Sequence, residues 1–301
     1  MKNKYLVIIL GPTGAGKTDL SISLALHFRS EIISADSRQF YRELRIGTAA
    51  PSPEQLRRVG HHFIGHLSVS EYFNVSMFEV RALRLLEELF GRMDIVFACG
   101  GSGLYINVLC HGIDEFPQVD PGIRETLLQR YRQQGLEGLR RELEKADPAY
   151  YGQVDLNNPG RILKALEVYY MTGTPYSAFL GRKKQERPFA IIKIGLNMDR
   201  QELYGRINRR VDSMMASGLV EEARALLPYR DTNALNTVGY KEVFRYLDGE
   251  LSLGEATALI KRNSRRYARR QLTWFRKDKD IRWFSPGERD KIIDYIEQHC
   301  G

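Results

Sequence analysis

The sequence is poor in cysteine and in long apolar runs, and both shortages exclude classes of protein. Its 301 residues include three cysteines, Cys99, Cys110 and Cys300, which form no CxxC pair. A disulfide scaffold and a cysteine-based zinc module are therefore excluded, and a reducing compartment is indicated. The longest uncharged apolar run near the start, Tyr5–Leu10, is too short for a membrane span or a signal-peptide core. We therefore expect a cytoplasmic chain that is neither secreted nor embedded in a membrane.

Acidic residues are fewer than basic ones, and the imbalance lies in one place. The chain carries 45 Lys/Arg against 37 Asp/Glu, a net charge of +8 at pH 7. The segment Lys261–Arg282 alone holds ten basic and two acidic residues, so the rest of the chain sums to zero. A concentrated basic segment indicates a polyanionic partner such as nucleic acid.

Strands alternate with helices over the first hundred residues. Three apolar runs predict buried strands: Tyr5–Leu10, Glu31–Ala35 and Asp94–Cys99. Apolar residues at helical spacing predict helices over Asp19–Phe28 and Asn74–Phe90. This alternation predicts an α/β fold with a parallel sheet covered by helices. Ligands of such a sheet bind beyond the carboxyl ends of its strands.

The pattern becomes purely helical from about Pro117. Pro121–Lys145 and Asn157–Met171 are predicted helices with no strand between them, and a strand pattern returns at Phe189–Leu196. We therefore expect a catalytic core of residues 1–116 and 188–301, interrupted by a helical insertion domain of residues 117–187. Further helices are predicted over Arg200–Ser217, Leu219–Leu227, Gly239–Leu247 and Leu253–Arg276.

A phosphate-binding loop follows the first strand. Gly11–Thr18 fits the pattern G-x-x-x-x-G-K-T between a strand and a helix, which is the context that the motif requires. Small residues let backbone N–H groups cradle a diphosphate, Lys17 adds positive charge, and Thr18 offers a hydroxyl to Mg²⁺. The sheet is thus expected to be P-loop NTPase-like. The predicted diphosphate-binding residues are Gly11, Pro12, Thr13, Gly14, Ala15, Gly16, Lys17 and Thr18.

An acidic residue is missing where most P-loop enzymes have one. The strand Asp94–Cys99 runs into Gly100–Gly103 without an Asp or Glu at its end. Nucleoside triphosphatases use a carboxylate there to hold the metal ion. An ordinary nucleoside triphosphatase is therefore disfavoured, whereas a kinase with another metal ligand remains open.

Two polar residues follow the other strands. Asp36 ends the second strand, which we expect to lie beside the first, so that its carboxylate faces Lys17. There it could act as a general base or cap a turn, and its position does not decide between them. Ser102 follows the third strand and either offers its hydroxyl to the same crevice or serves as a turn residue.

Seven motifs in this order resemble those of the tRNA dimethylallyltransferases over nearly the whole chain. They are Gly11–Thr18; Asp36–Tyr41 with Ile46–Ala49 and His61-His62; Gly100–Tyr105; Arg161–Val168 with Thr172-Gly173; Arg206 and Arg210 with Gly218-Leu219; Val238–Tyr240; and Arg269–Trp274. The resemblance implies transfer of a dimethylallyl group from dimethylallyl diphosphate to N6 of the adenosine 3′-adjacent to the anticodon, with release of diphosphate. The implied partner is the anticodon stem-loop of tRNA, and we expect a monomer.

The resemblance also implies roles for individual residues. The P-loop would hold a diphosphate leaving group with Mg²⁺, which accounts for the missing acidic residue, and Asp36, Ser102 and Lys17 would be catalytic. Arg206 and Arg210 would approach the diphosphate, although two arginines four residues apart also suit a solvated helix face. The implied tRNA contacts are Asp36, Ser37, Arg38, Gln39, Ser102, Arg124, Gly160, Arg161, Ile162, Leu163, Lys164, Arg265 and Arg269.

The basic segment has a helical spacing of its own. Arginines recur along one predicted face, and a row without interleaved acidic residues favours contact with phosphates over a solvated surface. The row consists of Arg262, Arg265, Arg266, Arg269 and Arg270. The histidines His61, His62 and His66 have no carboxylate or cysteine pattern beside them, so we expect packing or RNA contact there instead of a metal site.

Two other functions remain open. A small-molecule or nucleoside kinase would turn over ATP but leaves the basic segment unexplained. A nucleic-acid-binding module with a nucleotide-sensing P-loop would form no product.

Overall fold

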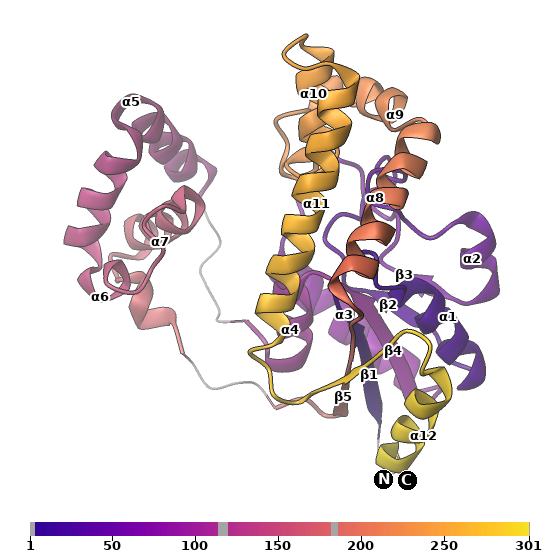
Figure 1. Cartoon of the computed structure of the whole chain (residues 1–301). Coiled ribbons are helices and arrows are strands. Elements are labelled where there is room, and N and C mark those ends of the chain that lie inside the picture. The colour runs from indigo at the N-terminus through magenta and orange to yellow at the C-terminus, as the bar shows by residue number, and fades with distance from the viewer. Residues whose placement is uncertain (1–3, 114–119, 182–185, 301) are drawn as a thin grey trace. The chain divides into compact units, whose positions relative to one another are not determined.

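The computed structural model describes residues 4–113, 120–181 and 186–300, and the chain divides into two compact units. The sheet unit contains residues 1–111 and 187–301, and the helical unit contains residues 112–186 (Figure 1). The predicted boundary at residues 116–117 lies outside the described residues.

The sheet unit is built on six parallel strands in the order β3-β2-β4-β1-β5-β6. The predicted parallel sheet is therefore confirmed. The strands are β1 Tyr5–Leu10, β2 Ile32–Ser34, β3 His61–His62, β4 Ile95–Gly100, β5 Ala190–Leu196 and β6 Ile281–Phe284.

One expectation about the sheet is wrong: β2 does not lie beside β1. Strand β4 lies between them, with Cys99 opposite Ile9 of β1 on one side and Ser34 of β2 on the other. Both strands have buried side chains, but β4 has six residues and pairs along its length with β1, whereas β2 has only three. The loop after β4 therefore separates the P-loop from Asp36.

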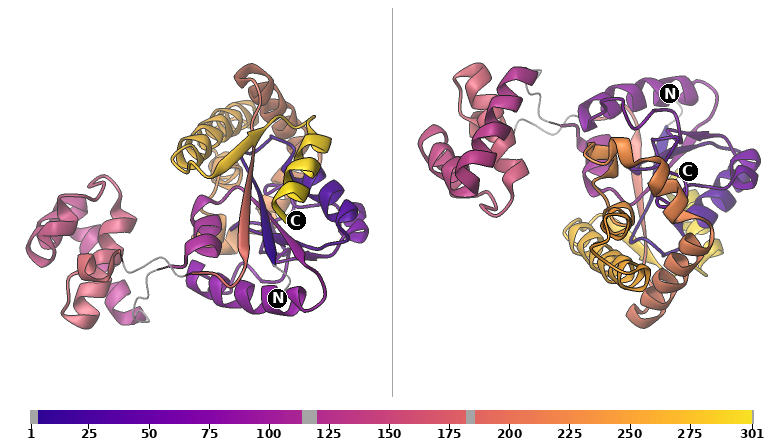
Figure 2. Two further views of the ribbon diagram at one scale, coloured as in Figure 1. Left: turned by 90° about the horizontal axis from the view of Figure 1, so that it is seen from below. Right: turned by 90° about the horizontal axis from the view of Figure 1, so that it is seen from above.

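Helices cover both faces of the sheet. Tyr5, Val7 and Ile9 of β1 pack with α1 and α12 in one apolar cluster. Helices α3 and α4 pack on each other and cover the opposite face (Figure 2). The helices of this unit are α1 Lys17–His27, α2 Pro53–Arg58, α3 Val75–Phe90, α4 Gly103–His111, α8 Arg200–Ala216, α9 Leu219–Ala225, α10 Tyr240–Leu247, α11 Leu253–Phe275 and α12 Arg289–Cys300, with short 3₁₀ turns at Leu227–Tyr229 and Asn233–Leu235.

The helical unit has a core of its own. Its elements are α5 Pro121–Ala146, α6 Pro148–Tyr151, α7 Pro159–Thr172 and a 3₁₀ turn at Tyr176–Phe179. Gly135, at φ 68°, interrupts α5, and leucines on either side of it pack against Ile162 and Leu166 of α7. Asp147 is buried and accepts hydrogen bonds from the backbone N–H of Tyr150 and from both the N–H and the hydroxyl of Ser177. None of the helices in the described part of the chain is long and apolar enough to cross a membrane.

Candidate active site

The P-loop joins β1 to α1 in a conformation that needs glycine. Gly16 caps α1 at φ 84°, in the left-handed region that side chains disfavour. A Cβ at Gly11 would lie 2.5 Å from the carbonyl oxygen of Leu196. The loop thus turns tightly into the N-terminus of α1, where unpaired N–H groups and the helix dipole favour an anion.

Lys17 lies folded over this loop. Its Nζ donates a hydrogen bond to the carbonyl oxygen of Pro12 at 2.8 Å. Burial, together with a smaller effect of the Arg210 charge, lowers the pKa of Lys17 to about 8, and the nearby groups Cys99 and Asp36 oppose this shift. Lys17 is therefore mainly cationic at pH 7, as a diphosphate site requires.

Thr18 lies in the first turn of α1, where the motif places a metal-binding hydroxyl. Among the described residues, no cluster of three or more His, Cys, Asp or Glu side chains could hold a metal ion by itself. Mg²⁺ suits such a site because it commonly keeps several waters and takes the remaining ligands from substrate phosphates.

A buried amide connects the P-loop to the loop after β4. Gln271 of α11 accepts a hydrogen bond from the backbone N–H of Thr13 at 2.9 Å, and its Nε2 donates to the carbonyl oxygen of Gly101 at 2.8 Å. The sequence-based prediction did not include Gln271. Its place inside the motif Arg269–Trp274 was the available signal.

Asp36 occupies the loop after β2. One carboxylate oxygen accepts a hydrogen bond from the backbone N–H of Arg38 at 3.0 Å, so the residue does cap a turn. Its charge also acts on Arg210: burial lowers the pKa of that guanidinium, and Asp36 opposes the effect. Asp36 is therefore near enough to Lys17 and Arg210 for its charge to act on both, in addition to capping its turn.

Ser102 lies between the two loops. Its hydroxyl oxygen accepts a hydrogen bond from the N–H of Ser37 at 3.2 Å and lies 3.3 Å from the Ser37 hydroxyl. Burial and the Asp36 charge raise the pKa of Tyr267 to about 12, and a hydrogen bond with Ser102 opposes this shift. The neutral phenol of Tyr267 is thus a further group at this site that the sequence-based prediction did not include.

An aromatic cluster anchors the segment Asp36–Gln39. Phe40 follows it directly and is fully buried. Its ring packs against those of Phe63, His66, Phe73, Phe78 and Tyr105. Because Tyr105 belongs to the motif that also contains Ser102, this cluster joins the segment Asp36–Gln39 to the helix that follows the Ser102 loop.

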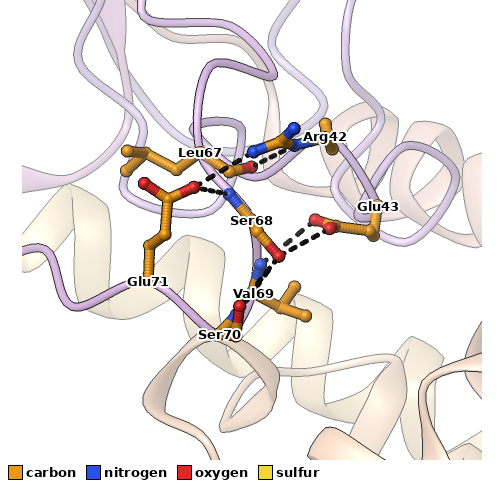
Figure 3. Close-up of polar contacts among 7 residues, drawn as sticks. All are labelled: Arg42, Glu43, Leu67, Ser68, Val69, Ser70 and Glu71. Atoms are coloured by element: carbon orange, nitrogen blue, oxygen red, sulfur yellow. Dashed lines mark hydrogen bonds and ion pairs between the residues drawn. The ribbon is translucent and has the colours of Figure 1, made fainter.

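A network of polar contacts holds the chain just beyond Phe40. Glu43 accepts hydrogen bonds from the hydroxyl of Ser68 at 2.8 Å and the N–H of Val69 at 3.1 Å. Glu71 accepts from the N–H of Ser68 and pairs with Arg42, which also donates to the Leu67 carbonyl (Figure 3). These contacts join the chain at Arg42 and Glu43 to the segment Leu67–Glu71.

The two predicted diphosphate arginines on α8 have different contacts. A Cβ at Gly16 would lie 3.8 Å from a guanidinium nitrogen of Arg206, which also pairs with Glu202. Arg210 donates to the carbonyl oxygen of Thr48 at 3.3 Å, an atom that Gln39 also approaches. The pair therefore borders the P-loop and the Asp36 loop.

One carboxylate fixes the loop that Arg210 contacts. Glu222 of α9 accepts hydrogen bonds from the N–H groups of Arg45, Ile46 and Gly47 and from the hydroxyl of Tyr240. The motif Val238–Tyr240 thus supports the site from a distance.

The arginines of α11 do not share one exposed face. Arg265 donates to Asn208 at 2.6 Å and lies over the ring of Tyr204, so it faces α8. Arg269 and its exposed neighbours line an open depression instead. Its lining residues are Arg269, Arg270, Thr273, Trp274 and Lys277.

The predicted RNA-contact residues of the helical unit differ in their exposure to solvent. Gly160 and Arg161 are exposed at the start of α7. The side chains of Ile162 and Leu163 are instead buried in the apolar core, so neither side chain is exposed for an RNA contact.

The charged residues of this unit gather around α5 and α7. Arg124 donates to buried Glu167 at 2.5 Å. Burial lowers the pKa of Lys164, and the charge of Glu167 opposes the shift.

The histidines have structural contacts. His62 lies 2.6 Å from a Glu31 oxygen, the Nδ1 of His61 lies 2.8 Å from the Val59 carbonyl, and His66 belongs to the aromatic cluster around Phe40.

Comparison with known proteins identifies the family of the chain. The family model described as IPP transferase matches residues 39–278. The chain is 55% identical to tRNA dimethylallyltransferase 1 of Phocaeicola vulgatus over 97% of both chains, and 52% identical to that of Bacteroides fragilis over 99% of both. The structure resembles a tRNA isopentenylpyrophosphate transferase from Bacillus halodurans, with 38% identity, a TM-score of 0.72 and 99% and 97% of the two chains covered.

A eukaryotic dimethylallyltransferase structure, 24% identical with a TM-score of 0.83, covers 98% of this chain and 80% of its own and shares the fold. The resemblance inferred from the seven motifs is confirmed by these matches. The chain therefore belongs to the IPP transferase family, that of the tRNA dimethylallyltransferases.

Proposed function

We propose that this enzyme transfers a dimethylallyl group from dimethylallyl diphosphate to N6 of the adenosine 3′-adjacent to the anticodon of tRNA. Family membership carries the coarse activity, dimethylallyl transfer to tRNA. One observation carries the finer chemistry: β4 pairs directly with β1, yet it ends in glycines without a carboxylate, while Asp36 lies one strand further out. That arrangement suits a diphosphate leaving group better than phosphoryl transfer.

The donor side of the site would stabilise the leaving group. As the allylic C–O bond breaks, its electron pair passes to the diphosphate, which gathers negative charge. The P-loop N–H groups, Lys17 and the arginines Arg206 and Arg210 would stabilise that charge as it develops. Mg²⁺, held by Thr18 and the diphosphate oxygens, would add positive charge there.

The acceptor side would activate a weak nucleophile. The lone pair of the adenine N6 amine is delocalised into the ring, so attack is helped by removal of a proton as the C–N bond forms. Asp36 would accept that proton. Ser102, held against Ser37, would orient the base.

The tRNA would be bound by loops and helices around this site. An adenine must leave its stack to reach a reacting group in an enzyme pocket, and RNA loops are read through splayed bases and phosphate contacts. The segment Ser37–Gln39 would contact the target region, and Arg265 and Arg269 would approach the RNA backbone. In the helical unit, Gly160, Arg161, Lys164 and Arg124 would form a second contact region.

One assay separates this function from its alternatives. The protein is incubated with unmodified tRNA, Mg²⁺ and dimethylallyl diphosphate labelled in the prenyl group. Label is expected in tRNA, on the adenosine beside the anticodon, with one diphosphate released per transfer. ATP consumption without labelling would favour the kinase, and tRNA binding without product would favour the nucleic-acid module. Size-exclusion chromatography of the same sample tests the proposed monomer.

A further inference from the structure

One face of α11 covers the loops of the proposed active site. Tyr267, Gln271 and Trp274 are spaced by four and three residues, so they lie on the same side of the helix. The indole of Trp274 packs over Gly103, where an added Cβ would meet it at 2.4 Å. Tyr267 adjoins Ser102, and Gln271 lies between the two aromatic side chains along the helix. These uncharged side chains adjoin the exposed arginines of the same helix: Trp274 lines the depression with Arg269 and Arg270, and the Arg270 guanidinium lies over the Tyr267 ring.

Gln271 is buried and uses both ends of its amide. Its side chain is only 6% exposed. The carbonyl end accepts from the N–H of Thr13, and the amino end donates to the carbonyl of Gly101. Only one orientation of the amide satisfies both partners, because a flipped amide would set its NH₂ group against the Thr13 N–H. The bridge therefore has a defined direction.

The partner loop is shaped for this contact. A Cβ at Gly101 would lie 2.3 Å from the Gln271 Nε2 and 3.5 Å from the Gly11 carbonyl oxygen. The backbone of Gly101 does not adopt the left-handed conformation, so the glycine is required by the close approach of the amide. Thr13, whose N–H is bonded, belongs to the donor side of the proposed reaction. Ser102, the residue after Gly101, belongs to the acceptor side.

We propose that Gln271 is a positioning residue that sets the separation between the P-loop and the loop of Ser102. Transfer needs the allylic carbon and the adenine N6 to meet at near-bonding distance, and a shift of about 1 Å can cost about 100-fold in rate. Gln271 touches neither substrate in this role. It acts through Thr13 and Gly101. The proposal rests on the function proposed above.

The first test removes both hydrogen bonds at nearly constant volume. For Gln271→Met we expect kcat to fall about 10- to 100-fold, with KM for each substrate within about threefold of wild type, since the binding groups stay but their alignment is lost. Gln201→Met, at an exposed position on α8, is the matched control and should keep wild-type kcat. A wild-type kcat in Gln271→Met, or a rise in KM alone, would overturn the proposal.

The second test perturbs the bridge from the other side and does not alter α11. Gly101→Ala would push the flexible amide away, so it should lower kcat to a similar level. If both changes break one bridge, the double variant should be no slower than the slower single variant, whereas independent effects would multiply. If the kcat losses of the two single variants multiply in the double variant, the proposal is wrong, even where Gln271→Met folds poorly. Wild-type protein that transfers no label overturns the proposed function itself and this inference with it.

Discussion

The sheet unit and the helical unit hold their functional residues in different ways. In the sheet unit, the site is assembled from loops far apart in the chain: the Thr13–Gln271 hydrogen bond spans 258 positions and the Ser37–Ser102 bond spans 65. In the helical unit, the remaining RNA-contact candidates, Gly160, Arg161, Lys164 and Arg124, lie on two helices that pack on each other.

This difference indicates which steps each unit controls. In the proposed reaction, proton transfer and leaving-group stabilisation demand fixed distances, which the long-range hydrogen bonds of the sheet unit would supply. Phosphate contacts tolerate small displacements because they are long-range and electrostatic. Substitutions in the sheet unit should therefore act mainly on kcat or donor use, and those in the helical unit on tRNA affinity or on local stability.

The largest effect is expected at Asp36. Asp36→Asn keeps an oxygen for the Arg38 N–H but cannot take a proton, so kcat should fall about 10²- to 10⁴-fold with tRNA affinity nearly unchanged. Label transfer under single-turnover conditions measures this. Asp155→Asn is the matched control, because exposed Asp155 makes the same two-residue turn, to Asn157, in the helical unit. If Asp36→Asn retains wild-type kcat, Asp36 is not the general base and only caps its turn.

The next effect concerns Lys17 and pH. Its pKa in the free enzyme is about 8, so the side chain is cationic below that pH and neutral above it. Because the diphosphate favours the cation, kcat/KM for the donor should fall about tenfold per pH unit once pH exceeds the pKa. The kinetic profile between pH 7 and 10 measures this. Lys17→Arg should shift the fall to higher pH, and an unchanged profile in Lys17→Arg would assign it to another group.

Local patterns predicted the P-loop because its function depends on residues that are neighbours in the chain. Gly11–Thr18, the preceding strand and the following helix can all be recognised within Tyr5–Phe28. The strand order was not legible in this way: β2 and β4 are both short apolar runs, and nothing local indicates which of them pairs with β1. The edge strands β3 and β6 were missed because two histidines and the charged, aromatic run Ile281–Phe284 carry no clear alternation.

Site residues were missed for the same reason, the lack of a local pattern. Gln271 acts through partners at Thr13 and Gly101, and no spacing along α11 reveals a partner 258 positions away. For Ile162 and Leu163, by contrast, a local pattern was available and was not used. Their apolar side chains fit the buried stripe of α7, and periodicity alone would have placed them in the core.

Within the helical unit, substitution of Arg124 tests whether this residue stabilises the fold or binds RNA. Glu167 is 1% exposed and one of its oxygens has no hydrogen-bond partner among the described residues, so removing Arg124 leaves a poorly compensated buried carboxylate. Arg124→Ala should destabilise this unit by about 1 kcal/mol, the low end for a charged partner because Arg124 is half exposed. Thermal unfolding and hydrogen exchange in α7 measure this, with exposed Arg132→Ala as control. Weaker tRNA binding at unchanged stability would make Arg124 an RNA contact instead.

The smallest effect is expected at Arg161, and it bears most directly on what the helical unit does. Arg161 is exposed at the start of α7, so Arg161→Ala removes a charge without opening the core. If the side chain meets one phosphate, tRNA affinity should fall a few-fold at low salt, and the slope of log K against log salt should decrease by about 0.7 to 0.9. Arg141→Ala, a similarly exposed arginine on α5, should leave both quantities unchanged. A loss of kcat in Arg161→Ala at saturating tRNA would contradict the division of labour between the two units, because a phosphate contact alone cannot alter the alignment of the reacting atoms.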